Sequence, residues 1–239
     1  MSNKDITKLT IELIDSLKST TGAFGLAGTG SEYKIVTEIF LYKFFNDKFG
    51  YEAKRNKLYG ERLCKKESNW DEEYDKFTEE EVEDLFSYLP ASVPRLKPEH
   101  TLSHIYNSAN KGDFADILDA TLLDIASLNS DTFAVTTSGK SKVNIFSQIT
   151  TYITDINKRD EFAKSLIRNI ASFNFEEVFS EKYDFFSGIF EHLLKGFNNA
   201  GGGKYAEYYT PRAIAQVMAR LLVGDNADLH NIECYDPSA

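Results

Sequence analysis

The sequence has few cysteines and no segment typical of a signal peptide or a membrane helix. The two cysteines among 239 residues, Cys64 and Cys234, lie too far apart to form a disulfide framework or a metal knuckle. No run of about 18 apolar residues occurs, and the N-terminal stretch mixes charged with apolar residues, which excludes a membrane helix and a signal peptide. We therefore expect a cytoplasmic protein that does not contact a membrane.

Positive charge is also in short supply. The chain has 27 Lys and Arg residues against 37 Asp and Glu residues, a net charge of -10, which is the wrong sign for holding DNA by neutralising phosphates. A nucleic-acid function would therefore need a separate basic partner. Apolar residues are plentiful at 42%, with 18 Phe and 13 Tyr, and they predict a folded, aromatic-rich core.

Helical periodicity dominates the first 200 residues. The predicted helices cover residues 4–18, 33–49, 101–109, 113–128, 143–157, 159–173 and 180–197. The second is apolar on most faces and should be buried, whereas the glycine-rich stretch before it favours a mobile loop. No segment before residue 230 alternates convincingly as a strand.

Capping residues and prolines mark several boundaries. Thr78 is placed to cap a helix that Glu81 continues, within a highly charged stretch from residue 52 to 84 that predicts short solvated helices. Asp113 is a plausible cap for the helix that follows it. Three prolines between residues 90 and 98 indicate a connector.

The C-terminal segment carries the most specific pattern. After a glycine run at 201–203, Thr210 is a good N-cap and Pro211 suits the first helical position, so a helix should begin there. Its free N-terminal amides suit a carboxylate. Residues 232–235 alternate as one short strand that ends in the turn at Asp236-Pro237.

This order of features resembles the N6-adenine DNA methyltransferase family, specifically the modification subunit of type I restriction-modification systems. The likeness rests on residues 32–49 (EYKIVTEIFLYKFFNDKF) and on residues 180–239, which include YDFFSGIFEHLLKGF, YYTPR and DPSA. It implies a mainly α fold, in which a helical N-terminal domain (1–175) precedes a connecting helix and the first helix and strand of a Rossmann-like, S-adenosylmethionine-dependent methyltransferase domain (176–239).

The resemblance also implies a cofactor site. One wall would be formed by Glu207, Tyr208, Tyr209, Thr210, Pro211 and Arg212, and the cofactor loop would begin with Asp236, Pro237, Ser238 and Ala239. The aromatic faces can attract the sulfonium cation. The loop glycines and the family's Asn/Asp-Pro-Pro-Phe/Tyr motif do not occur within the 239 residues, so we expect no catalytic residue and no methyl transfer from these residues alone.

Partners follow from the same resemblance. The complete protein would transfer a methyl group from S-adenosylmethionine to adenine in DNA, together with a specificity subunit, a restriction subunit and a second modification subunit. A different interpretation is a non-catalytic helical assembly module with a vestigial methyltransferase segment.

Two local patterns suggest other sites only weakly. His100 and His104 lie four residues apart, but no third metal ligand is evident and we expect no metal site. Residues 134–141 (AVTTSGKS) resemble a phosphate-binding loop, but Ala134 replaces its first glycine.

Overall fold

The computed structural model is mainly α-helical and describes residues 3–65, 69–133, 135–136, 142–176, 179 and 212–224. The helices are α1 (Asn3–Ala23), α2 (Gly30–Lys54), α3 (Gly60–Leu63), α4 (Trp70–Tyr74), α5 (Glu79–Tyr88), α6 (Leu102–Ser108), α7 (Phe114–Leu128), α8 (Ser130–Phe133), α9 (Ile156–Ala171) and α11 (Arg212–Val223). Two 3-10 helices, η1 (Pro98–His100) and η2 (Ile149–Tyr152), and two short strands, β1 (Val135–Thr136) and β2 (Lys142–Val143), complete the elements. Among the described residues, no helix is long and apolar enough to span a membrane.

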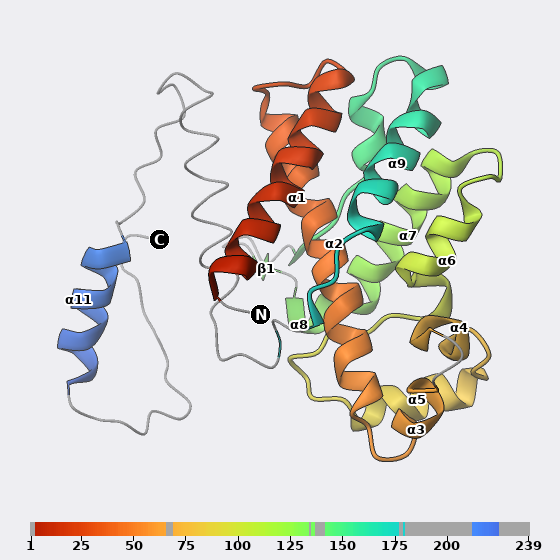
Figure 1. Cartoon of the computed structure of the whole chain (residues 1–239), viewed down its shortest axis with the longest axis vertical. Coiled ribbons are helices and arrows are strands. Elements are labelled where there is room, and N and C mark those ends of the chain that lie inside the picture. The colour runs from red at the N-terminus through yellow and green to blue at the C-terminus, as the bar shows by residue number, and fades with distance from the viewer. Residues whose placement is uncertain are drawn as a thin grey trace.

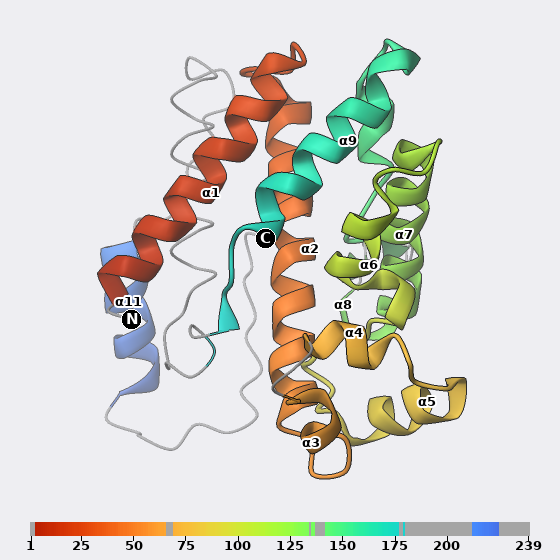
Figure 2. The same cartoon turned by 45° about the vertical axis from the view of Figure 1, so that its right-hand side comes forward.

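Helix α2 is the central element of the helical region. It runs from the α1–α2 turn to the end of the fold that carries α3 to α5, and it contacts α1, α3, α4 and α9 (Figures 1 and 2). Ile35, Val36 and Ile39 are fully buried, as expected for a helix that is apolar on most faces. The predicted burial of this helix is therefore confirmed, although it extends beyond 33–49 at both ends.

Aromatic side chains fill the core along α2. The Phe45 ring lies 5.1 Å from Phe133 and 5.6 Å from Phe146, centroid to centroid. Further along the helix, the Phe49 ring lies 5.2 Å from Tyr74. These contacts join α2 to elements that are distant in the sequence, as an aromatic-rich composition predicts.

The glycine-rich turn between α1 and α2 is held by one carboxylate. Glu32 accepts hydrogen bonds from the Thr21 hydroxyl at 3.0 Å and from the Gly28 backbone N–H at 2.7 Å. Gly25 and Gly28 have φ values of 84° and 71°, a conformation that favours glycine. The sequence indicated that no regular element forms here, and the structure adds the side chain that closes the turn.

The helix predicted over 143–157 is wrong. Between the end of β2 at Val143 and the start of α9 at Ile156, the chain is irregular apart from η2, because two buried carboxylates bind its backbone. Glu38 accepts from the Ser147 N–H at 2.8 Å, and Asp119 accepts from the Thr150 N–H at 3.1 Å. Burial raises the pKa of both carboxyl groups. These long-range bonds engage N–H groups that a local helix would use.

Two other details correct the predicted pattern. The antiparallel pair β1–β2 lies in a region where no strand was predicted, and Val135 pairs with Val143 in it. The helix predicted over 159–173 begins earlier, at Ile156, with Asp155 capping the Asn157 N–H at 3.1 Å.

The predicted caps have different outcomes. Thr78 and Glu81 form a reciprocal capping box at the start of α5, so that prediction is confirmed. Asp113 occupies the cap position of α7 with a φ of 58°, and its side chain makes no capping hydrogen bond. The Asp160 carboxylate instead accepts from the Ala115 N–H at 2.8 Å, so the first turn of α7 is satisfied from α9.

Candidate functional site

Most of the predicted cofactor site lies outside the described residues. This applies to Glu207, Tyr208, Tyr209, Thr210 and Pro211, to Asp236, Pro237, Ser238 and Ala239, and to the predicted helix 180–197 and strand 232–235. Arg212 is the first residue of α11. A helix therefore begins where the Thr-Pro pair predicts one.

Helix α11 has the predicted apolar face, and that face is exposed to solvent. Its members are Ile214, Val217, Met218, Leu221 and Leu222, whose exposed fractions range from 52% to 86%. In Figure 1 α11 lies apart from the bundle around α2. The helix is thus a candidate packing element whose apolar side is uncovered.

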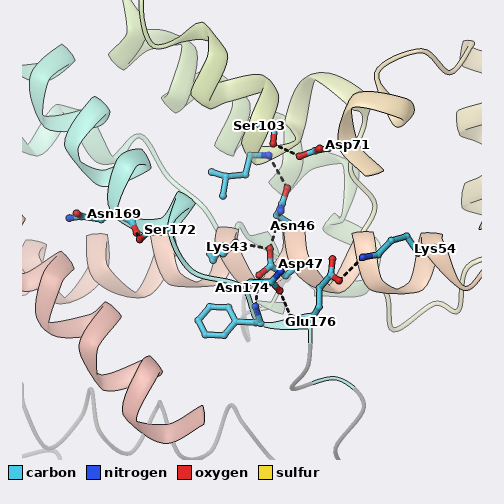
Figure 3. Close-up of polar contacts among 12 residues, drawn as sticks. Lys43, Asn46, Asp47, Lys54, Asp71, Ser103, Asn169, Ser172, Asn174 and Glu176 are labelled. Carbon is cyan, nitrogen blue, oxygen red and sulfur yellow. Dashed lines mark hydrogen bonds and ion pairs between the residues drawn. The ribbon is translucent and has the colours of Figure 1, made fainter. Parts of the chain in front are cut away.

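The segment after α9, which leads toward residue 181, is anchored to α2. The Phe175 backbone N–H donates to Asp47 Oδ2 at 2.8 Å, and the buried Phe175 ring lies 5.5 Å from Phe40. One residue further, Glu176 forms an ion pair with Lys54 at 2.5 Å. Figure 3 shows both anchors on the same side of α2. We call residues 172–176 with these anchors the junction.

A buried ion pair supports the junction from within α2. Lys43 Nζ lies 2.8 Å from Asp47 Oδ1, and the two residues are 4% and 5% exposed. The Asn46 side-chain amide donates to Asp47 at 3.0 Å and accepts from the Leu102 N–H at 2.8 Å (Figure 3). Such a pair is stable in the interior only if further hydrogen bonds satisfy it. Here Asn46 and Phe175 supply them.

Sequence reasoning missed this network, although one signal was present. Lys43 and Asp47 are spaced i,i+4 inside a helix that is otherwise apolar on most faces. Charged residues at helical spacing in a buried helix must find partners. The spacing could therefore have predicted the pair, but not its bond to Phe175, which lies 128 residues away.

A polar cleft of about 920 Å³ opens beside this network, between α2, α4, α6 and the end of α9. Two ion pairs line it: Lys43 with Asp47, and Lys54 with Glu176. Asp71 accepts a hydrogen bond from Ser103 across the cleft (Figure 3). Because the lining includes both Asp47 and the Lys54–Glu176 pair, the cleft lies directly beside the anchors of the junction.

The two weak local patterns have structural explanations. His100 Nε2 lies 2.8 Å from Asp124, whereas His104 Nδ1 lies 3.1 Å from Asp75. Each ring thus has its own carboxylate, and the part of the chain that the structure describes holds no group of three potential metal ligands. In the stretch 134–141, Val135 and Thr136 form β1, and residues 137–141 lie outside the described ranges.

Comparison with known proteins finds a family similarity in the C-terminal segment. The N-6 DNA methylase family model matches residues 181–239, which include α11 and every predicted cofactor residue. This part of the chain is therefore related to DNA methyltransferases, a family that uses S-adenosylmethionine and acts on DNA. No curated protein and no solved structure matches the chain.

Proposed function

We propose that the chain is the N-terminal part of a DNA adenine-N6 methyltransferase that serves as the modification subunit of a type I restriction-modification system. The observation that carries the proposal is the N-6 DNA methylase match over residues 181–239, together with a helix that starts at Arg212 directly after Tyr-Tyr-Thr-Pro. The reaction is transfer of the S-adenosylmethionine methyl group to adenine N6 in duplex DNA.

Each proposed cofactor residue has a physical role. Tyr208 and Tyr209 present aromatic faces to the sulfonium cation. Thr210 caps α11, whose N-terminal amides receive the methionine carboxylate. Glu207, Pro211 and Arg212 complete this wall. Asp236, Pro237, Ser238 and Ala239 begin the loop that passes under the cofactor.

In this proposal the two regions of the chain have different roles. Residues 1–175 form a helical domain that helps to hold the DNA and a specificity subunit, and residues 176–239 begin the methyltransferase domain. The junction supports this boundary, because Asp47 and Lys54 fasten residues 175 and 176 to α2. With a net charge of -10, the chain relies on the specificity subunit for much of its grip on DNA. A second modification subunit and a restriction subunit complete the assembly.

The test combines the gene sequence with an activity assay. We expect the codons after Ala239 to encode Gly-x-Gly and, further on, Asn-Pro-Pro-Phe or a close variant. The full-length protein with its specificity subunit should transfer tritiated methyl groups into duplex DNA. Tyr209→Ala should lower this rate about tenfold, the equivalent of one cation–π contact, whereas Tyr106→Ala, an exposed tyrosine on α6, should not.

Cofactor binding by the 239 residues provides a separate check. Calorimetry should detect weak S-adenosylmethionine binding or none, because the loop glycines that let the backbone approach the cofactor are not among these residues. Micromolar binding would contradict the proposed division of the site. A stop codon directly after Ala239 in the native gene would favour the helical assembly module instead.

A further inference from the structure

One segment of this acidic chain is strongly basic. Residues 48–66 contain seven Lys or Arg side chains and two Glu side chains, a local balance of +5 in a chain whose net charge is -10. The segment covers the C-terminal end of α2, the turn that follows and α3. Both views place it at the end of the fold opposite the α1–α2 turn (Figures 1 and 2). Clustered cations of this kind are the electrostatic signature of a surface that binds a polyanion.

The turn between α2 and α3 has a fixed geometry. Asn56 Oδ1 accepts from the backbone N–H groups of Leu58 at 2.9 Å and Tyr59 at 3.2 Å. Gly60 allows the chain to close, because a Cβ there would lie 2.5 Å from the Lys54 carbonyl oxygen. The backbone from Asn56 to Gly60 therefore occupies a defined position. We call Arg55, Lys57 and Leu58 the basic tip.

The cations of the tip differ from the other cations of the segment. Four of the others form ion pairs: Lys48 with Glu52, Lys54 with Glu176, Arg62 with Glu81 and Lys65 with Glu73. Arg55 and Lys57 are exposed, and within the described ranges neither forms an ion pair with a carboxylate. Their positive charge is therefore available to an external anion.

Arg55 is also oriented in advance. Its guanidinium lies 5.1 Å from the centroid of the Tyr51 ring, and Nη1 donates to the Tyr51 hydroxyl at 2.9 Å. The guanidinium has five N–H donors, so most of them remain available beyond this bond. A phosphate bound here would restrict less side-chain freedom than it would at an unsupported lysine.

Leu58 gives the tip an apolar component. Leu58 is 61% exposed. The backbone N–H groups of Leu58 and Tyr59 donate to Asn56 Oδ1, and these bonds hold Leu58 next to Lys57. An apolar side chain beside two cations fits the edge of a nucleic-acid groove, where phosphates flank sugar and base surface.

Neighbouring acidic helices limit which side can approach DNA. Residues 69–84 contain nine Asp or Glu residues and one Lys. Tyr59 Oη donates to Asp84 at 2.8 Å, and Arg62 pairs with Glu81, so side chains of α5 bond to residues next to the tip. Figure 2 shows α5 extending away from the α2–α3 turn. The acidic side repels phosphates, which leaves the tip as the approach side.

We infer that the basic tip contacts the backbone of duplex DNA, with Arg55 and Lys57 each binding a phosphate and Leu58 lying against the groove edge. The inference rests on the proposed function, which supplies DNA as the substrate. It adds an interaction made by the helical region itself, independent of the specificity subunit and of the cofactor segment.

The test measures DNA binding by the 239-residue chain against salt concentration. Fluorescence anisotropy with a labelled duplex of about 24 base pairs, long enough to span two turns of a major groove, would be recorded at low and moderate KCl, with protein concentrations up to the high micromolar range. Arg55→Gln/Lys57→Gln should lower the slope of log K against log[KCl] by about 2, since each phosphate that is no longer neutralised accounts for about 0.9. The affinity at the lowest salt should fall at least tenfold. Leu58→Ser should weaken binding severalfold without changing the slope.

The matched control is Lys111→Gln/Lys158→Gln. It removes the same charge from two exposed lysines outside the basic segment, of which Lys158 lies 3.9 Å from Asp155, and it should change the affinity less than twofold. Equal effects of the two double variants would overturn the inference, as would no duplex binding at the lowest salt. Binding to anionic phosphatidylserine vesicles that needs the tip, without duplex binding, would assign the tip to a membrane surface instead.

Methyl transfer by the full-length protein separates the two proposals. If the wild-type complex methylates DNA and the tip variant keeps the wild-type salt slope, the proposed function stands and the inference is wrong. If no methyl transfer occurs but the duplex affinity of the chain depends on the tip, the DNA-binding role of the tip stands and the proposed function is wrong.

Discussion

Helices α2 and α11 present the same kind of apolar surface in opposite environments. Along α2, Ile39 and Phe49 are fully buried, whereas on α11 Leu221 and Leu222 are 79% and 86% exposed. Both helices form where their sequences predict. The difference is that α2 has α1, α3, α4 and α9 packed around it. Local sequence is therefore enough to predict a helix, but burial requires partners from elsewhere in the chain.

The same contrast separates stability from chemistry. The described core surrounds α2, whereas the residues related to N-6 DNA methylases begin at residue 181, beyond the junction. Substitutions around α2 should therefore act on folding, and substitutions in the cofactor segment should act on the proposed methyl transfer. Pairs of variants, one from each region, test this division.

The largest effect is expected from removing a core aromatic ring. Phe49→Ala should lower the free energy of unfolding by about 3–5 kcal/mol, because the ring is fully buried against Tyr74 and Trp70. Leu222→Ala on α11 should change it by less than about 0.5 kcal/mol. Urea denaturation followed by circular dichroism measures both. A large decrease for Leu222→Ala would show that α11 is packed in solution, which would end the contrast between the helices.

A somewhat smaller decrease is expected at the buried ion pair. Asp47→Asn removes the charge that balances Lys43 and should cost about 3 kcal/mol. It also weakens the anchor of Phe175. The control Lys43→Met/Asp47→Leu removes both charges and should recover much of the stability. If the double variant were no more stable than Asp47→Asn, the bond to Phe175 would matter more than the pairing of charges, and the junction would be the stronger link.

The sequence predicts those parts of the fold whose determinants are local. Thr78 and Glu81 lie three residues apart, and their capping box forms as predicted. Five of the seven predicted helices lie within the described residues in correct or extended form, since apolar periodicity needs only neighbouring residues.

Long-range bonds explain the failures. A helix over 143–157 would need the backbone N–H groups of Ser147 and Thr150 for its own hydrogen bonds. In the structure these groups donate to Glu38 and Asp119, which lie 109 and 31 residues away. The role of Asp160 at the start of α7 is equally non-local. For the candidate site, local pattern predicts the start of α11, whereas the junction and the polar cleft require tertiary contacts that periodicity does not contain. The residue roles in the cofactor segment remain predictions from resemblance.

The smallest effect is a change with pH in the stability of the helical region. Burial lowers the pKa of His100, and this outweighs the opposing effect of Asp124; Glu99 also raises the pKa and Lys97 lowers it. The folded state therefore binds a proton less readily than the unfolded chain. The stability that the neutral ring contributes is fully present above the ordinary histidine pKa of about 6.5 and is lost as the pH falls below it.

A comparison of His100→Gln with the wild type isolates this proton. The wild-type melting temperature should fall more steeply than that of the variant between about pH 7.5 and pH 5.5, because glutamine cannot be protonated. Glu38 and Asp119 have raised pKa values and favour folding as the pH falls, but both proteins carry them, so their contribution cancels in the difference. Parallel pH profiles would mean that His100 is protonated as readily in the folded protein as in the unfolded chain. Its bond to Asp124 would then offset the effect of burial on its pKa, and burial in the helical region would not change the protonation of this ring.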